Sequence, residues 1–270
     1  MTTTALPARA HLIAGGFPPG ASAGHDHDHA RLQLLELLAE QEVAASVAND
    51  FGDVLKWLPA SRLLITYVAG PYPDGAQCRA IEEWMQAGGR WLGLHGTSGG
   101  RAERVAGFRQ RRTVKLDHHA LLGSYFLTHP PICKIRVDVA GGDGVLTRGL
   151  PPSFDVEDEP YFIELQDPAS TRVVLTADYG RGVTSPTIGT IYESDTSLLP
   201  DGTTRVLGYT KVIGAGGVAY VALGHCHNPA IRSGRAVDPM DTSPLTFRGS
   251  WEVEPFKALL RNAIAWGLGS

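Results

Sequence analysis

A short apolar run between glycines constrains the fold of this chain more than any other stretch. Trp91 to Leu94 lies inside the sequence GGRWLGLHGTSGG, which covers residues 88–100. Such a run is typical of a strand buried on both faces of a parallel sheet, although its periodicity alone does not exclude a buried helix. His95 follows the predicted strand directly, before small residues that can turn tightly.

The position of His95 favours a ligand site, because ligands bind at the carboxyl ends of the strands in open α/β sheets. Residues 96–100 are too small to cover the imidazole, so it is expected to stand uncovered at this edge. The alternative is structural: a histidine at a strand end can donate to a loop carbonyl, and this is the commoner role for an isolated one. Further polar clusters after other predicted strands favour the functional interpretation here.

Strand and helix signals alternate before residue 88, with short loops between them. Strands are predicted at residues 11–16, 43–48 and 62–69 from their apolar and β-branched content. After the first of them Asp28 is placed to cap a helix, whose buried stripe is expected at Leu32, Leu35 and Leu38, helped by Leu34. This order implies a flavodoxin-like fold, in which a doubly wound, mostly parallel sheet is flanked by helices.

A second helix is predicted from a capping box. Asp74 and Gln77 have the three-residue spacing with which two side chains satisfy the free N–H groups at a helix start. Apolar residues then recur at helical spacing, at Cys78, Ile81, Trp84 and Met85. Cys78 is therefore interpreted as a core residue and not as a nucleophile.

The second half of the chain departs from this rhythm. Residues 101–108 are predicted to form a helix, and the basic run 109–115 and the pair His118-His119 to lie on the surface. Residues 205–213 and 218–223 flank a GAGG turn and predict an added antiparallel hairpin.

The end of the chain combines a long polar segment with a final helix. Residues 228–251 are too long and too polar for an ordinary connection, and are interpreted as a lid or a mobile segment. The closing helix is expected to begin at Pro255 and to end before Gly267.

Composition limits the class of protein. The chain has 270 residues, 43% of them hydrophobic and 19% charged, which predicts one globular domain over residues 1–270. Its formal net charge of −4 gives no basic field, so neither nucleic acid nor a membrane is expected as a partner. The N-terminal stretch has no signal-peptide pattern and the three cysteines form no CxxC pair, which favours a cytoplasmic location. A homo-oligomer is compatible with the sequence.

Three further polar clusters lie next to predicted strands. Residues 25–28, HDHD, precede the first helix and fit a solvated loop or a weak metal-binding tract as well as a ligand site. Residues 224–227, GHCH, end the second strand of the predicted hairpin. Asp158 and Glu159 are neighbours, so only one of the two can face a site. Glu159 is assigned to the site and Asp158 to a supporting role.

Together these stretches resemble the trehalose-utilisation (ThuA-like) family, whose fold is that of class I glutamine amidotransferases. The matching stretches, in chain order, are HDHDHARL from residue 25, GGRWLGLHGT from residue 88, LLGSYFLTHPP from residue 121, DEPY from residue 158, LGHC from residue 223 and GSW from residue 249. The family usually has leucine where this chain has Pro160, and His27 and His29 are additions. The resemblance implies a role in carbohydrate catabolism and a sugar or keto-sugar substrate.

The same resemblance predicts that one activity is missing. Amidotransferases of this class place a nucleophilic cysteine on the turn where this chain has His95. An imidazole cannot act as the thiolate that forms a glutamyl thioester. No glutaminase activity is therefore expected.

The polar residues are compatible with acid and base chemistry on a sugar by an isomerase, lyase or hydrolase. His25, His95, Glu159 and His225 are the predicted catalytic residues, because histidine exchanges protons near neutral pH. A keto group also acidifies the C–H beside it. Substrate contacts are expected at Asp26, Asp28, Gly96, Thr97, His129, Asp158 and Tyr161.

The sequence requires no cofactor, but these side chains can hold a divalent metal ion, either zinc or manganese. His25, His95 and His225 are the predicted ligands, and the ion would polarise a carbonyl or water oxygen. The alternative function is a non-catalytic sugar-binding or regulatory module on the same fold. An enzyme needs the functional side chains within reach of one common atom, whereas a binding protein needs only a lined cleft.

Overall fold

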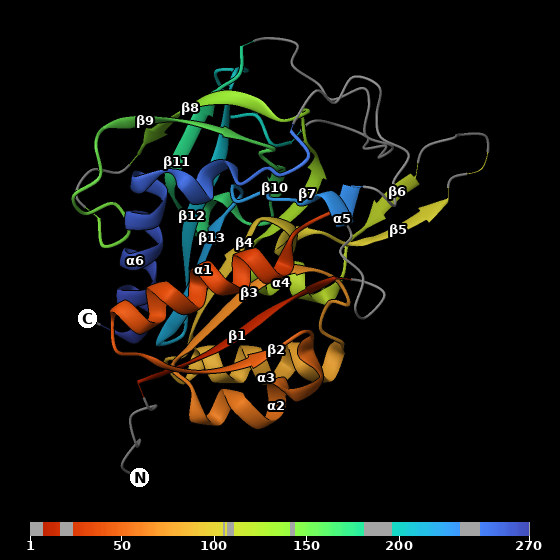
Figure 1. Ribbon diagram of the computed structural model, residues 1–270. Helices are drawn as coiled ribbons and strands as arrows, with labels where there is room; N and C mark the ends of the chain where they lie inside the picture. Colours follow the sequence, from red (N-terminus) through yellow and green to blue (C-terminus); the bar gives the residue numbers. More distant parts are fainter. Residues whose placement is uncertain are drawn as a thin grey trace.

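The computed structural model describes residues 8–16, 24–104, 106, 111–140, 144–180, 196–232 and 244–269 (Figure 1). Within the segment predicted to be a lid or mobile, residues 233–243 lie outside the described residues. In the described ranges, no helix has the length and apolar character needed to cross a membrane.

A mixed sheet forms the centre of the fold. In the described part of the chain it has nine strands, in the order β2-β1-β3-β4-β13-β12-β11-β8-β9. The first five pair in parallel and are β2 (Ala44–Ala48), β1 (Arg9–Gly16), β3 (Leu63–Ala69), β4 (Arg90–Leu94) and β13 (Gly216–Val221). The other four pair antiparallel and are β12 (Thr204–Ile213), β11 (Thr171–Asp178), β8 (Cys133–Val139) and β9 (Ser153–Asp158). Since β12 and β8 alone run against the rest, seven of these nine described strands share one direction.

Helices cover both faces of the sheet, which confirms the predicted doubly wound fold (Figure 1). The helices α1 (His27–Glu40) and α6 (Glu254–Leu268) contact each other on one face. On the other face lie α2 (Val54–Trp57) and α3 (Gly75–Gln86). The predicted hairpin is confirmed as β12 and β13, and it continues into a larger antiparallel part than the sequence indicated.

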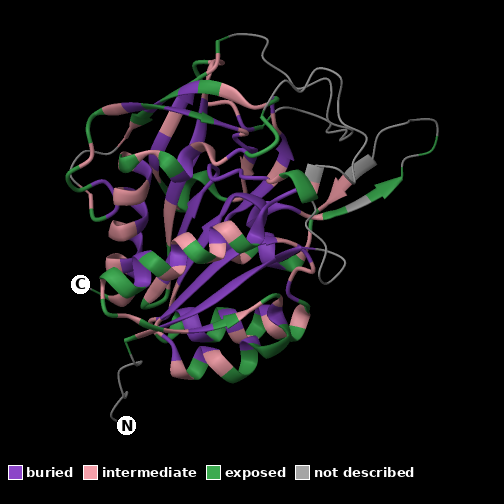
Figure 2. Ribbon diagram, in the orientation of Figure 1, coloured by how far each residue is buried: buried purple, intermediate pink, exposed green. Residues whose placement is uncertain are grey.

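Four of the five parallel strands, β1, β3, β4 and β13, form the buried layer of the protein (Figure 2), whereas β2 is mostly exposed or half-buried. Every described residue of β1 after Arg9 is buried, and β3 is buried up to Val68. A strand covered on both faces has no solvent side, so its residues do not alternate between apolar and polar. Trp91 and Leu94 are fully buried in β4, which confirms the strand interpretation of the central apolar run.

The first helix differs from its prediction in its cap and in its buried face. The cap is Asp26, not Asp28, because the Asp26 carboxylate accepts from the His29 N–H at 3.1 Å and the helix begins at His27. Leu34 and Leu38 are buried as expected, but Leu32 is 53% exposed. Two residues correspond to about 200° around a helix, so Leu32 and Leu34 lie on opposite sides.

The segment after His95 was also predicted wrongly. The described part of residues 101–108 contains no helix: β5 (Arg101–Arg104) pairs antiparallel with β6 (Arg111–Val114), and the two strands project from the body (Figure 1). His118 and His119 are not on the surface but fully buried in α4 (Asp117–Leu122). Burial is possible because backbone carbonyls of residues 97–99 accept from both imidazoles.

Smaller elements complete the fold. The strand β7 (Ser124–Thr128) pairs with β10 (Phe162–Leu165), and α5 (Pro229–Arg232) is a single turn. The capping box of Asp74 and Gln77 is present at the start of α3. At the end of α6, Gly267 lies inside the helix, and Gly269 ends it with a φ of 83°.

The corrected buried face of α1 can be tested with two leucines of the same helix. Leu34→Ala is expected to lower the free energy of unfolding by about 2–5 kcal/mol, because it removes a fully buried side chain. Leu32→Ala is the matched control and is expected to change it by less than about 0.5 kcal/mol. Urea unfolding monitored by circular dichroism measures both values. Equal losses would contradict the observed orientation of the helix.

Candidate functional site

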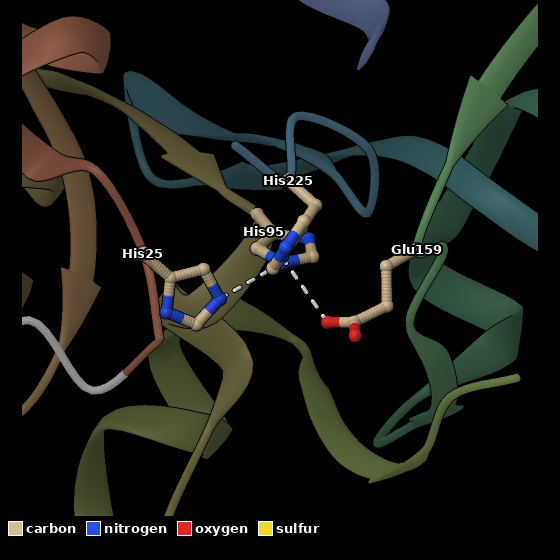
Figure 3. A group of neighbouring side chains, drawn as sticks. All are labelled: His25, His95, Glu159 and His225. Carbon is tan, nitrogen blue, oxygen red and sulfur yellow. Dashed lines mark hydrogen bonds and ion pairs between the residues drawn. The ribbon is translucent and has the colours of Figure 1, made fainter. Parts of the chain in front are cut away.

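Four side chains from distant parts of the sequence converge at one edge of the sheet (Figure 3). They are His25, His95, Glu159 and His225, and one ligand-type atom from each lies within 4.8 Å of all the others. Each residue follows a strand that points in the same direction, namely β1, β4, β9 and β13 respectively. Carboxyl ends of strands that share a direction meet at the same edge, which is why the four residues meet.

His95 begins the turn η3 (His95–Ser98) in a left-handed backbone conformation, with a φ of 42°. Such a conformation costs a non-glycine residue on the order of 1–3 kcal/mol, so the surroundings must hold it. Side chains bind every carbonyl of the turn: Tyr220 binds that of His95, Tyr72 that of Gly96, His118 that of Thr97, and His119 those of Ser98 and Gly99. Gly96 also leaves no room for a larger residue, since a Cβ there would lie 2.4 Å from the Val68 carbonyl oxygen.

The imidazole of His95 does not stand uncovered, as the sequence had suggested, but is fully buried. The small residues of the turn do not cover the imidazole, but the ring of Tyr161 does. The centroids of the two rings are 3.9 Å apart. Its Nδ1 lies 3.0 Å from the carbonyl oxygen of Ala222. The structural role considered for His95 is therefore present as well.

This contact determines which nitrogen of His95 faces the site. A carbonyl oxygen only accepts, so Nδ1 carries the hydrogen. Burial, with a smaller effect of the neighbouring His225, lowers the pKa of His95 to about 3, so the ring is neutral at pH 7. The unprotonated nitrogen is then Nε2, which lies 3.1 Å from Nε2 of His25. A lone pair of His95 therefore points into the cluster.

Glu159 supplies a negative charge to the site. Its Oε2 lies 3.2 Å from Nδ1 of His225 and its Oε1 lies 3.2 Å from Nδ1 of His129. Burial by itself would raise the pKa of Glu159, but the charges of these two histidines and the hydrogen bond from His225 outweigh burial and lower it to about 2. The carboxylate is consequently ionised at neutral pH.

His25 is held through its neighbour Asp26. The Asp26 carboxylate accepts from Arg248 at 2.7 Å and from Asn228 at 2.8 Å, and its backbone N–H donates to the carbonyl of Cys226. Burial would raise the pKa of Asp26, but these hydrogen bonds outweigh burial and lower it. The first loop is thereby tied to the chain that leaves β13. Nε2 of His25 also lies 3.3 Å from the Tyr161 hydroxyl.

Asp158 holds the backbone that carries His225. It is fully buried, and its carboxylate accepts from the N–H groups of Gly224 at 2.8 Å and His225 at 3.0 Å and from the hydroxyl of Ser250. Burial raises the pKa of Asp158, and these donors offset only part of the effect. Glu159 and Asp158 thus lie as predicted from the alternation of neighbouring residues, one facing the cluster and the other supporting it.

Two of the predicted substrate contacts do not lie with the cluster. Asp28 forms an ion pair with Arg31 at the start of α1, and its side chain is 87% exposed. Thr97 is buried and its hydroxyl donates to the backbone carbonyl of Thr66 at 2.9 Å, so it joins η3 to β3. The sequence pattern placed both near His25 or His95 along the chain but could not indicate the direction of their side chains.

Several residues of the site were not predicted. His227 is buried and lies 3.1 Å from His225, Arg248 binds Asp26, and Ser250 binds Asp158. The hydroxyl of Tyr67 donates to the Gly224 carbonyl at 2.9 Å. His227 lies in the GHCH stretch and Ser250 in the GSW stretch, and this position was the only sequence signal for either residue. For Tyr67, an inward residue of a buried strand, the sequence contained no signal.

The fold and the site define a doubly wound α/β protein with a buried histidine and carboxylate cluster beyond the carboxyl ends of its strands. The profile of the ThuA family, described as trehalose utilisation, matches residues 20–234. The chain therefore belongs to the ThuA family. No curated protein matches it.

Solved structures share the fold at low sequence identity. A ThuA-like protein from Bacteroides uniformis has a TM-score of 0.64 and 16% identity, and the match covers 98% of this chain and 93% of that one. A ThuA-like protein from Parabacteroides merdae has a TM-score of 0.58 and 14% identity, covering 97% and 90%. A β-galactosidase from Rahnella sp. R3 has a TM-score of 0.53 and 15% identity, covering 82% of this chain but 29% of that one.

The supporting role of Asp158 can be tested against the exposed Asp28. Asp158→Ala leaves two buried N–H groups without their acceptor, and each such group costs about 1–3 kcal/mol. The free energy of unfolding of metal-free protein, measured with urea, is therefore expected to fall by roughly 2–5 kcal/mol. Asp28→Ala, at an exposed ion pair, is expected to change it by less than about 1 kcal/mol. A similar stability for both variants would contradict this role of Asp158.

Proposed function

We propose that this protein holds a divalent metal ion at His25, His95, Glu159 and His225, and that the centre serves acid and base chemistry on a sugar or keto-sugar. The observation that carries the proposal is the convergence of four ligand-type atoms within 4.8 Å of one another. In Figure 3 the four side chains point toward one another from separate segments of the chain.

The donor atoms suit zinc or manganese. Imidazole nitrogens and carboxylate oxygens bind both ions, whereas no thiolate, the ligand of softer metals, belongs to the described cluster. Donors about 2.0–2.2 Å from zinc lie roughly 3.3 Å from each other in a tetrahedron. The contact between His95 and His25 measures 3.1 Å and that between His225 and Glu159 3.2 Å. The remaining distances, which are at most 4.8 Å, would have to contract to complete such a site.

The charges of the site also favour a cation. The carboxylate of Glu159 is ionised and partly buried, and the neutral ring of His95 directs a lone pair at the same point. This partly buried negative charge is costly unless positive charge balances it, as the neighbouring histidines do in the metal-free protein. A divalent ion would provide that charge.

Around the proposed ligands, the chain offers groups that can bind a sugar. His129 lies against Glu159 with 15% of its side chain exposed, and the Tyr161 hydroxyl lies next to His25. We assign both to substrate contact, and Asp26, Gly96 and Asp158 to holding the ligands. When bound, a divalent ion polarises a carbonyl or water oxygen. Proton exchange beside a keto group would then fit an isomerase, lyase or hydrolase, in keeping with the trehalose-utilisation family.

The alternative is a non-catalytic sugar-binding or regulatory module. The same cluster could bind vicinal sugar oxygens without turnover, since a fold does not determine an activity. The presence of four ligand-type atoms at one point favours the enzyme, because a binding cleft does not need them.

We further propose a cytoplasmic location and no glutaminase activity. All three cysteines are free thiols. Burial raises the pKa of Cys226, the cysteine between His225 and His227, to about 12. A thiol that stays protonated cannot act as a nucleophile at neutral pH.

Metal analysis tests the proposed centre. Wild-type protein grown with zinc and manganese and dialysed against a mild chelator is expected to retain about one equivalent of one of these ions, measured by elemental mass spectrometry. His25→Ala is expected to weaken binding by more than about 100-fold, because losing even an outer partner of a ligand costs 10–100-fold. His29→Ala, in the same HDHDH tract but outside the cluster, is the matched control and is expected to bind like the wild type. A wild-type protein that holds neither ion would contradict the proposal.

A substrate screen separates the enzyme from the binding module. Incubation of metal-loaded protein with a panel of keto-glycosides, followed by NMR, is expected to show turnover by the wild type and none by His95→Ala, which lacks a proposed ligand. L-Glutamine serves as the negative control, with no release of ammonia expected. Tight binding of a sugar by calorimetry without any turnover would instead favour the binding module.

A further inference from the structure

A second buried histidine, His227, contacts His225. His227 is 3% exposed, and its Nδ1 lies 3.1 Å from Nε2 of His225. On its other side, Nε2 of His227 lies 2.9 Å from the carbonyl oxygen of Pro244. The backbone fixes the ring as well, because His227 and Phe247 exchange N–H to carbonyl bonds of 3.0 and 2.9 Å.

This chain of contacts determines where the hydrogens lie when both rings are neutral. The Pro244 carbonyl can only accept, so Nε2 of His227 carries the hydrogen and its Nδ1 is an acceptor. Nε2 of His225 must then donate to that acceptor. When His225 is neutral in the metal-bound centre, its unprotonated nitrogen is consequently Nδ1, the atom that in the metal-free protein lies 3.2 Å from Oε2 of Glu159 and hydrogen-bonds to that carboxylate.

We propose that His227 is a positioning residue that makes His225 present Nδ1, and not Nε2, as its metal-binding atom. The inference rests on the proposed metal centre and adds the residue that orients one of its ligands. Histidine ligands commonly donate their second N–H to such a partner, which fixes the tautomer and orientation of the ring.

The same device operates at His95 with the nitrogens exchanged. There the Ala222 carbonyl takes the hydrogen of Nδ1 directly and leaves Nε2 toward the cluster. At His225 the acceptor is Nδ1 of His227, which lies beside Nε2 of His225. His227 can accept there because its own Nε2–H donates to the Pro244 carbonyl. The centre is therefore expected to bind the ion through Nε2 of His95 and Nδ1 of His225.

Two isosteric substitutions test the role of His227. In His227→Asn the side-chain oxygen can take the place of Nδ1 as the acceptor, whereas His227→Leu has the same shape without an acceptor. Both variants lose the ring that packs on Phe247, so a difference between them reports the hydrogen bond to His225. The measurements are the dissociation constants of Zn²⁺ and Mn²⁺ by chelator competition, and the urea stability of the metal-free variants.

His227→Leu is expected to bind metal about 10–100-fold more weakly than the wild type, and His227→Asn to recover most of that loss. Their metal-free stabilities are expected to be similar, which separates positioning from folding. Histidine ¹⁵N NMR of the zinc-loaded wild type is expected to show His225 bound through Nδ1 and protonated at Nε2. Equal dissociation constants for the two variants, or His225 bound through Nε2, would overturn the inference.

Failure of the metal centre itself gives a different result. If the wild type binds neither ion, the proposed function fails, and NMR of the metal-free protein still tests His227. Protonation of His225 at Nε2 in the wild type and its loss in His227→Leu would then uphold the positioning role. The opposite tautomer in the wild type would exclude it.

Discussion

The contact between Nδ1 of His95 and the carbonyl oxygen of Ala222 is the interaction on which the site depends. It joins residues 127 positions apart, across the ends of the neighbouring parallel strands β4 and β13. Because the carbonyl takes the ring hydrogen, the other nitrogen of His95 faces the cluster in its unprotonated form. The geometry of the parallel sheet therefore determines which nitrogen of His95 carries the hydrogen.

The surrounding residues hold the imidazole of His95 in place although its backbone conformation is unfavourable. His95 has a left-handed backbone, and side chains from α4, from β13 and from the loop after β3 bind the carbonyls of its turn. A strained residue that is so heavily supported points to function and not to packing alone. The position is that of a nucleophile on a sharp turn after a strand, and here it carries an imidazole. In the proposed function this turn would hold a metal ligand in place of a nucleophile.

Buried polar groups around the cluster form two shells with distinct roles. The inner groups, among them Glu159 and His95, present oxygen and nitrogen lone pairs to one point. Outer groups such as Asp158, Asp26 and His227 make hydrogen bonds that fix the backbone or the tautomer of the inner ones. An arrangement of this kind would lower the cost of assembling the proposed metal centre, since its ligands would be oriented before an ion binds.

The sequence by itself determined the doubly wound fold and the four residues of the cluster, because short apolar runs and the polar residues after them are local signals. Leu32 and the His118-His119 pair show where such signals fail: which face of a helix is covered, and which polar group finds a buried acceptor, depend on neighbours distant in sequence. Tertiary structure alone decided the hydrogen position on His95 and, as we propose, that on His225, since the carbonyl of Ala222 is brought to His95, and that of Pro244 to His227, only by folding. It also decided that Glu159 reaches the cluster, because β9 runs in the same direction as β4 and β13 from the far edge of the sheet.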